Sequence, residues 1–204
     1  CADLITDDEI ILIAKYFHDV PLKSIYLADT YGSCNESKIQ IILNKFYLEF
    51  NKFNNNIRFG FHPHNNLEDS LTKANTSIFN GCSMIDTCIG GIGRGSGNLK
   101  TEILLCNLYK NNLFENKDKI YLVFNYYNKF IINKKEYNNN IFNNYHPYYV
   151  LSGILALHPN YILELLSNIE TDAFKDIDTI FELDKYTKLN NSRNFNKSYL
   201  EKIV

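Results

Sequence analysis

The segment FHPHNN places two histidines, His62 and His64, on either side of a proline. On a β-strand, residues two apart point to the same side, with Cα atoms about 6–7 Å apart. Two imidazoles at that spacing can share one metal ion, and a solvated turn that holds two histidines by chance is the alternative. Because Pro63 cannot donate to a sheet ladder, a buried parallel strand should end there. The pair is then expected at the carboxyl edge of a sheet, where α/β folds keep their active sites.

Two other apolar runs end in residues of similar interest. KSIYLAD ends in Asp29 and is followed by Thr30. Both residues could belong to a site at the same edge of the sheet, or they could cap a helix or shape a turn. CSMIDTCIGGIG leads into the loop GGIGRGSGN, which lacks a dinucleotide fingerprint because Ser96 stands where the third glycine is needed. It also lacks the Gly-Lys-Ser/Thr of a nucleotide-binding loop. The pattern instead indicates a loop whose backbone approaches another group closely.

The elements that would position these residues alternate between helix and strand. ITDDEIILIAKYF predicts a helix capped by Thr6 with Glu9 closing a capping box. NESKIQIILNKFYLEF predicts a second helix, with Ile39, Ile42, Leu43 and Phe46 on one face. LEDSLTKANTSIFNG, with Gly81 at its end, and LKTEILLCNLYKNN predict two more. Such alternation requires a parallel sheet with crossover helices.

The spacing of the strands narrows the fold class. Strand centres near Ile25, Ile57 and Ile85 lie 32 and 28 residues apart. A (β/α)8 barrel uses about 31 residues per unit, and a doubly wound sheet tolerates similar spacing. Spacing therefore favours the barrel modestly.

The pattern becomes helical after residue 116. KDKIYLVFNYYNKFI has helical periodicity despite its strong β-formers, and YHPYYVLSGILALHPNYILELLSN predicts two helices broken at His158-Pro159. AFKDIDTIFELDKY and NKSYLEKIV predict further short helices. We therefore expect residues 1–115 to be part of a barrel and residues 116–204 to be an α-helical C-terminal extension.

Composition excludes several classes of protein. The 204 residues are 45% hydrophobic and 22% charged, with a formal net charge of -2, so no steering towards nucleic acid or an anionic membrane is expected. Five cysteines without a CxxC pair indicate reduced thiols in a cytoplasmic protein. No apolar run reaches the roughly 20 residues that a membrane-spanning helix needs.

A long co-linear string of motifs carries a resemblance to a known family. FHPHNN, ANTSIFNGCSMIDTCIGGIGRGSGNLKTE and YLADTYGS resemble the metal-dependent aldolase and Claisen-enzyme superfamily that includes hydroxymethylglutaryl-CoA lyase. GIGRGSGNLKTE and YYVLSGILALHPNYILELL are most similar to its 4-hydroxy-2-oxovalerate aldolase-like branch. The resemblance extends from about Cys1 to Leu166. It implies a TIM (β/α)8 barrel with Mn²⁺ or Mg²⁺ at its carboxyl mouth.

The resemblance also assigns residues. The two histidine ligands of the family fall on His62 and His64, and Asn98 of the glycine loop is a ligand or lies next to one. The hydroxyl that contacts substrate falls on Thr30, with Asp29 beside it as a second substrate-binding candidate. A tyrosine that lines the aldolase site is Tyr148 or Tyr149.

The implied activity is a carbon–carbon lyase reaction that cleaves a 4-hydroxy-2-oxo acid, such as 4-hydroxy-2-oxovalerate, to pyruvate and an aldehyde. The family's first strand supplies an Asp ligand and an enolate-stabilising Arg that have no counterpart here. We therefore expect this sequence, which begins at Cys1 without methionine, to be the C-terminal part of a larger enzyme. As it stands it should bind metal weakly and not turn over.

Other functions and partners stay open. One is a Claisen-type acyl-CoA enzyme, similar to citramalate synthase, isopropylmalate synthase or hydroxymethylglutaryl-CoA lyase. Another is a non-catalytic partial barrel that acts as a binding or assembly module. Resemblance to the aldolase branch implies a 2-oxo acid substrate and an acylating aldehyde dehydrogenase as partner, and it leaves assembly into a homo-oligomer open.

Overall fold

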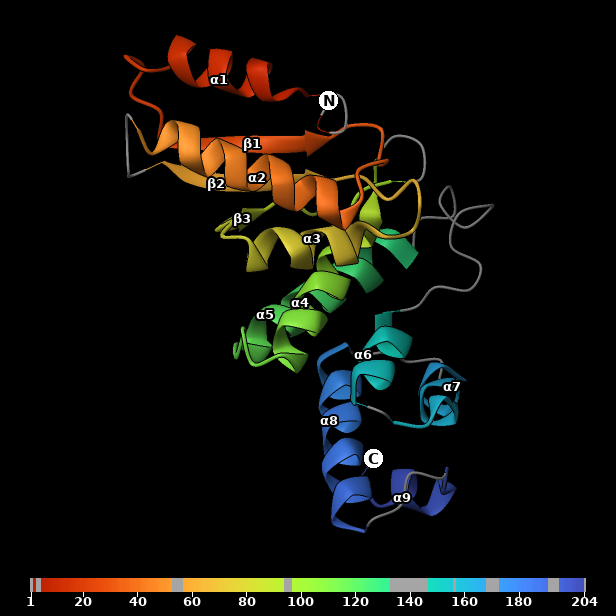
Figure 1. Ribbon diagram of the computed structural model, residues 1–204. Coiled ribbons are helices and arrows are strands. Elements are labelled where there is room, and N and C mark those ends of the chain that lie inside the picture. Colours follow the sequence, from red (N-terminus) through yellow and green to blue (C-terminus); the bar gives the residue numbers. More distant parts are fainter. Residues whose placement is uncertain are drawn as a thin grey trace. The chain divides into compact units, whose positions relative to one another are not determined.

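The computed structural model describes residue 2 and residues 5–52, 57–93, 97–132, 147–155, 157–167, 173–190 and 195–203 (Figure 1). The chain forms two compact units, Cys1–Lys100 and Thr101–Val204. Each unit has its own cluster of buried hydrophobic side chains.

Helices and strands alternate along the first unit, as the sequence predicts. The elements are α1 (Asp7–Tyr16), β1 (Ser24–Asp29), α2 (Glu36–Phe50), β2 (Arg58–Pro63), α3 (Ser70–Phe79), β3 (Met84–Ile85) and a 3-10 turn, η2 (Ile89–Gly91). The strands form a three-stranded parallel sheet in the order β1-β2-β3. Asp29 pairs with Pro63 in this register, so β1 and β2 end at the same edge.

The structure contains the predicted cap at the N-terminus of α1 and the predicted glycine after the C-terminus of α3. The N–H of Glu9 donates to the Thr6 hydroxyl at 3.3 Å, and the N–H of Thr6 donates to the Glu9 carboxylate at 2.8 Å, which confirms the capping box. Hydrogen bonds from the Thr6 backbone and hydroxyl lower the pKa of Glu9. After the C-terminal end of α3, Gly81 has φ +94°, a left-handed conformation that favours glycine after a helix.

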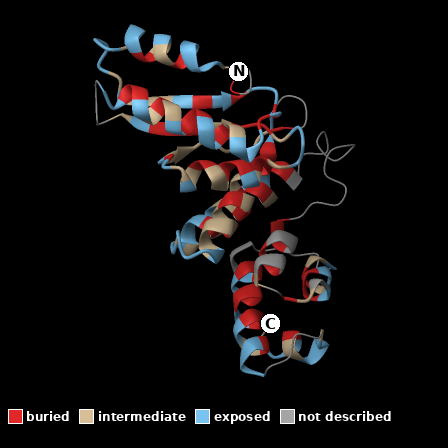
Figure 2. Cartoon of the chain, in the orientation of Figure 1, coloured by how far each residue is buried: buried red, intermediate tan, exposed pale blue. Residues whose placement is uncertain are grey.

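The core of the first unit lies between the sheet and its helices. The four α2 residues that the sequence places on one face are buried: Ile39, Ile42, Leu43 and Phe46. They belong to the same apolar cluster as Phe59 and Phe61 of β2. Phe59 and Phe61, two residues apart on β2, thus lie on one face of the sheet. Figure 2 shows buried residues on both the helices and the strands of this unit.

The regular secondary structure described in the second unit is all helical. The helices are α4 (Thr101–Lys110), α5 (Lys117–Tyr126), a π-helical turn η3 (Tyr127–Ile132), α6 (Pro147–Leu155), α7 (Pro159–Ser167), α8 (Ala173–Leu189) and α9 (Lys197–Glu201). The helical prediction for residues 117–131 and the break at His158-Pro159 are confirmed. The units divide after Lys100, within the segment that the sequence assigns to the barrel, and the domain boundary at residue 115 stays a prediction.

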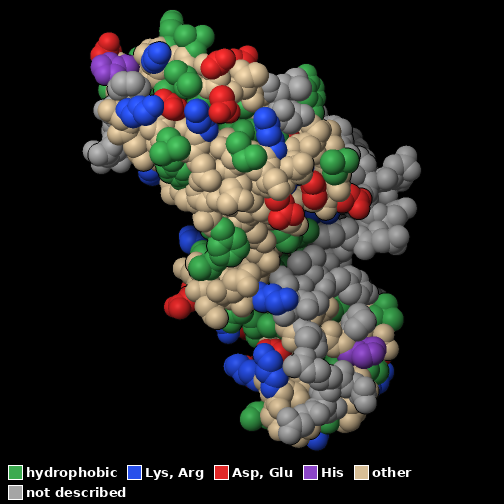
Figure 3. Space-filling view, in the orientation of Figure 1, with side chains coloured by type: hydrophobic (Ala, Val, Ile, Leu, Met, Phe, Trp, Pro, Cys, Tyr) green, Lys and Arg blue, Asp and Glu red, His purple; other side chains and the backbone are tan. Residues whose placement is uncertain are grey.

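The fold class is therefore α/β with parallel strands. Within the described ranges the sheet has three strands and forms no closed barrel. Figure 3 shows basic and acidic side chains interspersed on the visible face. No helix in the described part of the chain is long and apolar enough to cross a membrane.

Buried thiols give the protein a predictable response to alkaline pH. The described cysteines, Cys34, Cys82, Cys88 and Cys106, are thiols that form no disulfide. Burial raises the pKa of Cys82 to about 11, and burial with the nearby charge of Glu102 raises the pKa of Cys106 to about 12. The unfolded chain, with ordinary thiol pKa values near 9.0, releases these protons first. The thiol contribution to stability is therefore complete below pH 9 and is lost as pH rises towards the folded pKa values.

We expect the free energy of unfolding to fall between about pH 9 and 11 by up to about 1.4 kcal/mol per pH unit for each such thiol. Urea denaturation across this range should show a shallower decline for Cys106→Ala than for the wild type. Cys88→Ala is the matched control, because Cys88 is only partly buried. Equal slopes for all three proteins would contradict the prediction.

Candidate functional site

The carboxyl end of β2 brings the two histidines together. Their ring centroids lie 5.1 Å apart, with an angle of 71° between the ring planes. His62 has a side chain that is 33% exposed, whereas His64 is buried. The spacing argument from the sequence thus correctly places two imidazoles side by side at the edge where the strands end.

A second segment pairs with the chain at this edge. His64 and Asn98 form an isolated antiparallel bridge. The Asn65 N–H donates to the Gly97 carbonyl at 2.9 Å, and the Leu99 N–H donates to the Pro63 carbonyl at 3.3 Å. The predicted partner of the histidines, Asn98, is therefore held beside them by backbone hydrogen bonds.

The glycines of the loop allow it to fold tightly around the Asn98 side chain. Gly91 and Gly97 have φ values of +68° and +86°, and a Cβ on Gly97 would lie 2.2 Å from the Gly91 carbonyl oxygen. A Cβ on Gly93 would lie 2.8 Å from Asn98 Nδ2. This confirms the expectation that the loop backbone approaches another group closely. Residues 94–96, which include Arg94, lie outside the described residues.

The Asn98 amide is only partly satisfied. Its Nδ2 donates to the Ile92 carbonyl at 3.3 Å, while its Oδ1 is buried and has no hydrogen-bond partner among the described residues. An unsatisfied buried acceptor costs free energy unless a donor or a cation reaches it. Oxygen and imidazole donors suit divalent cations, so the residues present fit part of a metal site.

A carboxylate that would complete such a site is not seen within the described ranges. No group of three or more His, Cys, Asp and Glu residues in these ranges is arranged to hold a metal ion. Within these ranges, the candidate metal donors are His62, His64 and the side-chain oxygen of Asn98.

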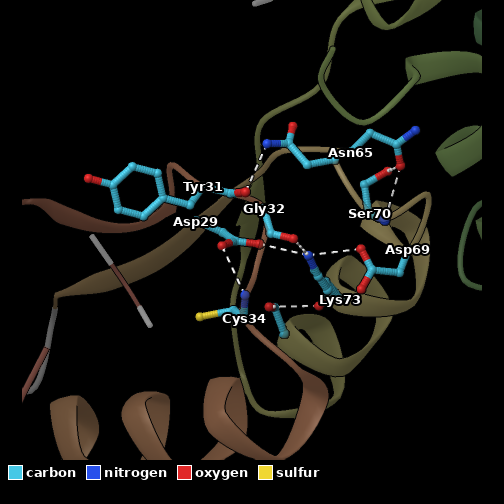
Figure 4. A network of polar contacts seen from close by, with 10 residues as sticks. Asp29, Tyr31, Gly32, Cys34, Asn65, Asp69, Ser70 and Lys73 are labelled. Atoms are coloured by element: carbon cyan, nitrogen blue, oxygen red, sulfur yellow. Dashed lines mark hydrogen bonds and ion pairs between the residues drawn. The ribbon is translucent and has the colours of Figure 1, made fainter. Parts of the chain in front are cut away.

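Asp29, a predicted substrate-binding residue, is engaged by a buried lysine (Figure 4). Lys73 of α3 is 1% exposed, and its Nζ lies 2.9 Å from Asp29 Oδ2 and 2.8 Å from Asp69 Oδ1. Lys73 also donates to the Gly32 carbonyl at 2.6 Å, and the N–H of Cys34 donates to Asp29 Oδ1 at 3.2 Å. The Asp29 carboxylate thus orders the turn after β1, and its role in substrate binding stays a prediction.

The charge state of Lys73 follows from these contacts. Burial acts to lower the pKa of Lys73, but hydrogen bonds to Asp69 and Asp29 and their negative charges outweigh it and raise the pKa. Lys73 is therefore an ammonium ion at neutral pH. It joins the turn after β1 to the start of α3, which follows the histidines in the chain.

A further contact joins the turn after β1 to the turn after β2. Asn66 Nδ2 donates to the Tyr31 carbonyl at 2.8 Å, and a Cβ on Gly32, which has φ +64°, would lie 2.8 Å from Asn66 Cβ. Thr30 is exposed in the first of these turns. Its position at the end of β1 is compatible with the predicted contact to substrate.

The two candidate tyrosines belong to α6 in the second unit. Tyr148 is buried, and its hydroxyl donates to Asp176 Oδ2 at 3.1 Å and accepts from Asn128 Nδ2 at 3.0 Å. These contacts give Tyr148 a structural place in the second core. The side chain of Tyr149 lies outside the described part of the structure.

Sequence reasoning missed the roles of two residues, Lys73 and Asp86. Asp86 directly follows β3, and its Oδ2 lies 3.1 Å from His62 Nδ1. A signal for Asp86 was present, because it is a carboxylate at the end of the strand next to the one that carries the histidines. Lys73 had no such signal, because a lysine within a helix is usually exposed.

Comparisons with known proteins identify the family to which this chain is similar. Residues 1–123 match the family model described as HMGL-like. A 4-hydroxy-2-oxovalerate aldolase from Carboxydothermus hydrogenoformans is 27% identical over 107 residues, which cover 52% of this chain and 30% of that protein. One from Bacillus thuringiensis is 30% identical over 95 residues, which cover 47% of this chain and 26% of that protein.

An oxaloacetate decarboxylase from Mycobacterium tuberculosis is 27% identical over 107 residues, covering 52% of this chain and 30% of that protein. Among solved structures, an HMG-CoA lyase from Acinetobacter baumannii has a TM-score of 0.49 and 21% identity, covering 58% of this chain and 40% of that one. The chain spans less than a third of the length of these curated relatives. Because the family model matches more than half of the chain, the resemblance seen in the sequence is confirmed, and the chain belongs to the HMGL-like family.

Proposed function

We propose that the chain supplies the histidine side of a divalent-metal site in a carbon–carbon lyase. The substrate is a 4-hydroxy-2-oxo acid such as 4-hydroxy-2-oxovalerate, which is cleaved to pyruvate and an aldehyde. The observation that carries the proposal is the pair of imidazoles, 5.1 Å apart, at the strand edge that also holds the buried, unpartnered oxygen of Asn98. The family and the names of the relatives support the same chemistry.

In this proposal His62, His64 and Asn98 hold the cation, Mn²⁺ or Mg²⁺. When bound, the cation supplies Lewis-acid stabilisation of the negative charge that develops on the 2-oxo group. Thr30 contacts the substrate from the end of β1. A carboxylate ligand and an arginine from elsewhere in a larger (β/α)8 barrel complete the site, and this chain alone does not turn over.

The reaction requires a proton to leave the 4-hydroxyl group of the substrate as the bond between C3 and C4 breaks. The electrons of that bond pass to C3 and the 2-oxo group, the aldehyde departs, and protonation at C3 yields pyruvate. An acylating aldehyde dehydrogenase is the proposed partner, because it would consume the aldehyde.

Decarboxylation of oxaloacetate is a second candidate function. It is favoured by the relative with that name, and it breaks the bond between C3 and C4 with the same flow of electrons, but with carbon dioxide as the leaving group. The same metal and histidines would serve either reaction. The two candidates differ in the group that departs from C3.

The deciding experiment is an assay of the full-length protein in which this sequence occurs. We expect pyruvate release from 4-hydroxy-2-oxovalerate in the presence of Mn²⁺, complete loss of release after chelation with EDTA, and recovery when Mn²⁺ is added back. Oxaloacetate is tested in parallel, with its spontaneous decarboxylation measured without protein. Release that persists after chelation contradicts the metal requirement. No release from either 2-oxo acid by the folded protein contradicts the lyase function, and turnover that needs an acyl-CoA would favour the Claisen alternative.

A further inference from the structure

Asp86 and His62 form a side-chain pair across neighbouring strands. The Oδ2 of Asp86 lies 3.1 Å from the Nδ1 of His62. Parallel pairing of β2 with β3 sets Phe61 beside Ile85, and the N–H of Asp86 donates to the Phe61 carbonyl at 3.0 Å. The backbone on both sides of the pair is therefore fixed by the sheet.

This contact determines which nitrogen of His62 carries the proton. A neutral imidazole has one N–H and one lone pair, and an ionised carboxylate only accepts hydrogen bonds. Nδ1–H of His62 must then donate to Asp86, which leaves the lone pair on Nε2. Metal-binding histidines in proteins commonly have this arrangement, with the second nitrogen donating to a carboxylate.

We propose that Asp86 is a positioning residue for His62: it selects the Nδ1–H tautomer and so presents Nε2 as the metal-binding atom. The inference rests on the proposed function and adds a residue to it. The pair is partly exposed, with side-chain exposures of 33% for His62 and 46% for Asp86. A partly exposed contact between two side chains contributes little to stability, so we expect Asp86 to affect the tautomer of the His62 imidazole and not the stability of the fold.

The ring of His62 is restrained on a second side by His64, whose ring lies edge-on to it. Asp86 thus fixes the tautomer while His64 limits rotation of the ring. The chain provides an internal comparison in His18, whose Nδ1 lies 2.7 Å from Asp19 Oδ1 in an exposed pair of adjacent residues. That second pair lies before β1, on the connection from α1.

The test uses long-range ¹H–¹⁵N correlation spectra of the ¹⁵N-labelled, metal-free chain at about pH 8, where an ordinary imidazole is neutral. We expect His62 to be in the Nδ1–H tautomer in the wild type and to shift towards Nε2–H in Asp86→Ala. Asp19→Ala is the matched control and should leave the His62 signals unchanged. A wild-type His62 with the proton on Nε2, or a tautomer that Asp86→Ala does not alter, overturns the inference.

Mn²⁺ titration, followed by the electron paramagnetic resonance signal of free Mn²⁺, gives the second readout. We expect Asp86→Ala to weaken binding by about 10–100-fold and Asp19→Ala to leave it unchanged. Unchanged affinity in Asp86→Ala, or a loss as large as that in His62→Ala, overturns the positioning role. A wild-type chain with the expected tautomer but no Mn²⁺ binding counts against the proposed metal function alone, because the spectra test Asp86 without metal.

Discussion

Lys73→Met is expected to lower the free energy of unfolding of the first unit by about 3–5 kcal/mol. The ammonium of Lys73 is the buried cation between Asp29 and Asp69, and Asp29 itself is fully buried. Methionine has a similar length but no charge, so the variant leaves the Asp29 carboxylate buried without its counterion. Loss of an ion's partner inside a protein is far more costly than loss of a surface pair.

The measurement is urea denaturation of the wild type and three variants, followed by circular dichroism. Lys52→Met is the matched control, because Lys52 forms a 2.6 Å ion pair with Glu49 but has a side chain that is 57% exposed. Its effect should stay within about 1 kcal/mol. The double variant Asp29→Asn/Lys73→Met removes both charges and should lose less stability than Lys73→Met alone. If Lys73→Met is no more harmful than Lys52→Met, the buried network does not stabilise the fold.

Features that depend on local pattern could be predicted from the sequence. The capping box at Thr6 and Glu9 needs only residues three apart, and both hydrogen bonds are present. The closeness of His62 and His64 follows from the alternation of side chains along one strand. The α/β alternation follows from the change between helical and strand periodicity, which is a property of short segments.

Features that depend on contacts distant in the sequence could not be predicted in the same way. Lys73 is buried only because Asp29, 44 residues earlier in the chain, lies at the end of β1 where α3 begins. The contact between Asp86 and His62 depends on the register of β2 against β3, which no single segment contains. For the same reason no pattern in the sequence indicated that Lys73 and the Cys34 N–H engage the Asp29 carboxylate, whose role in substrate binding stays a prediction.

His62→Ala and His64→Ala are each expected to weaken Mn²⁺ binding by the chain at least about 100-fold. Each change removes one of the two proposed imidazole ligands, and loss of a direct ligand should exceed the 10–100-fold cost of losing a residue that only orients one. Binding is measured by the decrease of the free Mn²⁺ signal during titration. His18→Ala is the matched control, because His18 is exposed, belongs to the same unit and has no role in the proposed site.

The two histidine variants are expected to differ in stability. Comparing them separates a loss of Mn²⁺ affinity caused by a lost ligand from one caused by a destabilised fold. His62 is partly exposed, so its truncation should leave the stability to urea close to that of the wild type, whereas His64 is buried and its truncation removes packing. A loss of Mn²⁺ affinity in His62→Ala at unchanged stability therefore reports ligation. If His62→Ala and His18→Ala bind Mn²⁺ equally well, the two imidazoles do not share a cation. Their 5.1 Å separation is then a packing contact at the end of β2, and the lyase proposal loses the observation that carries it.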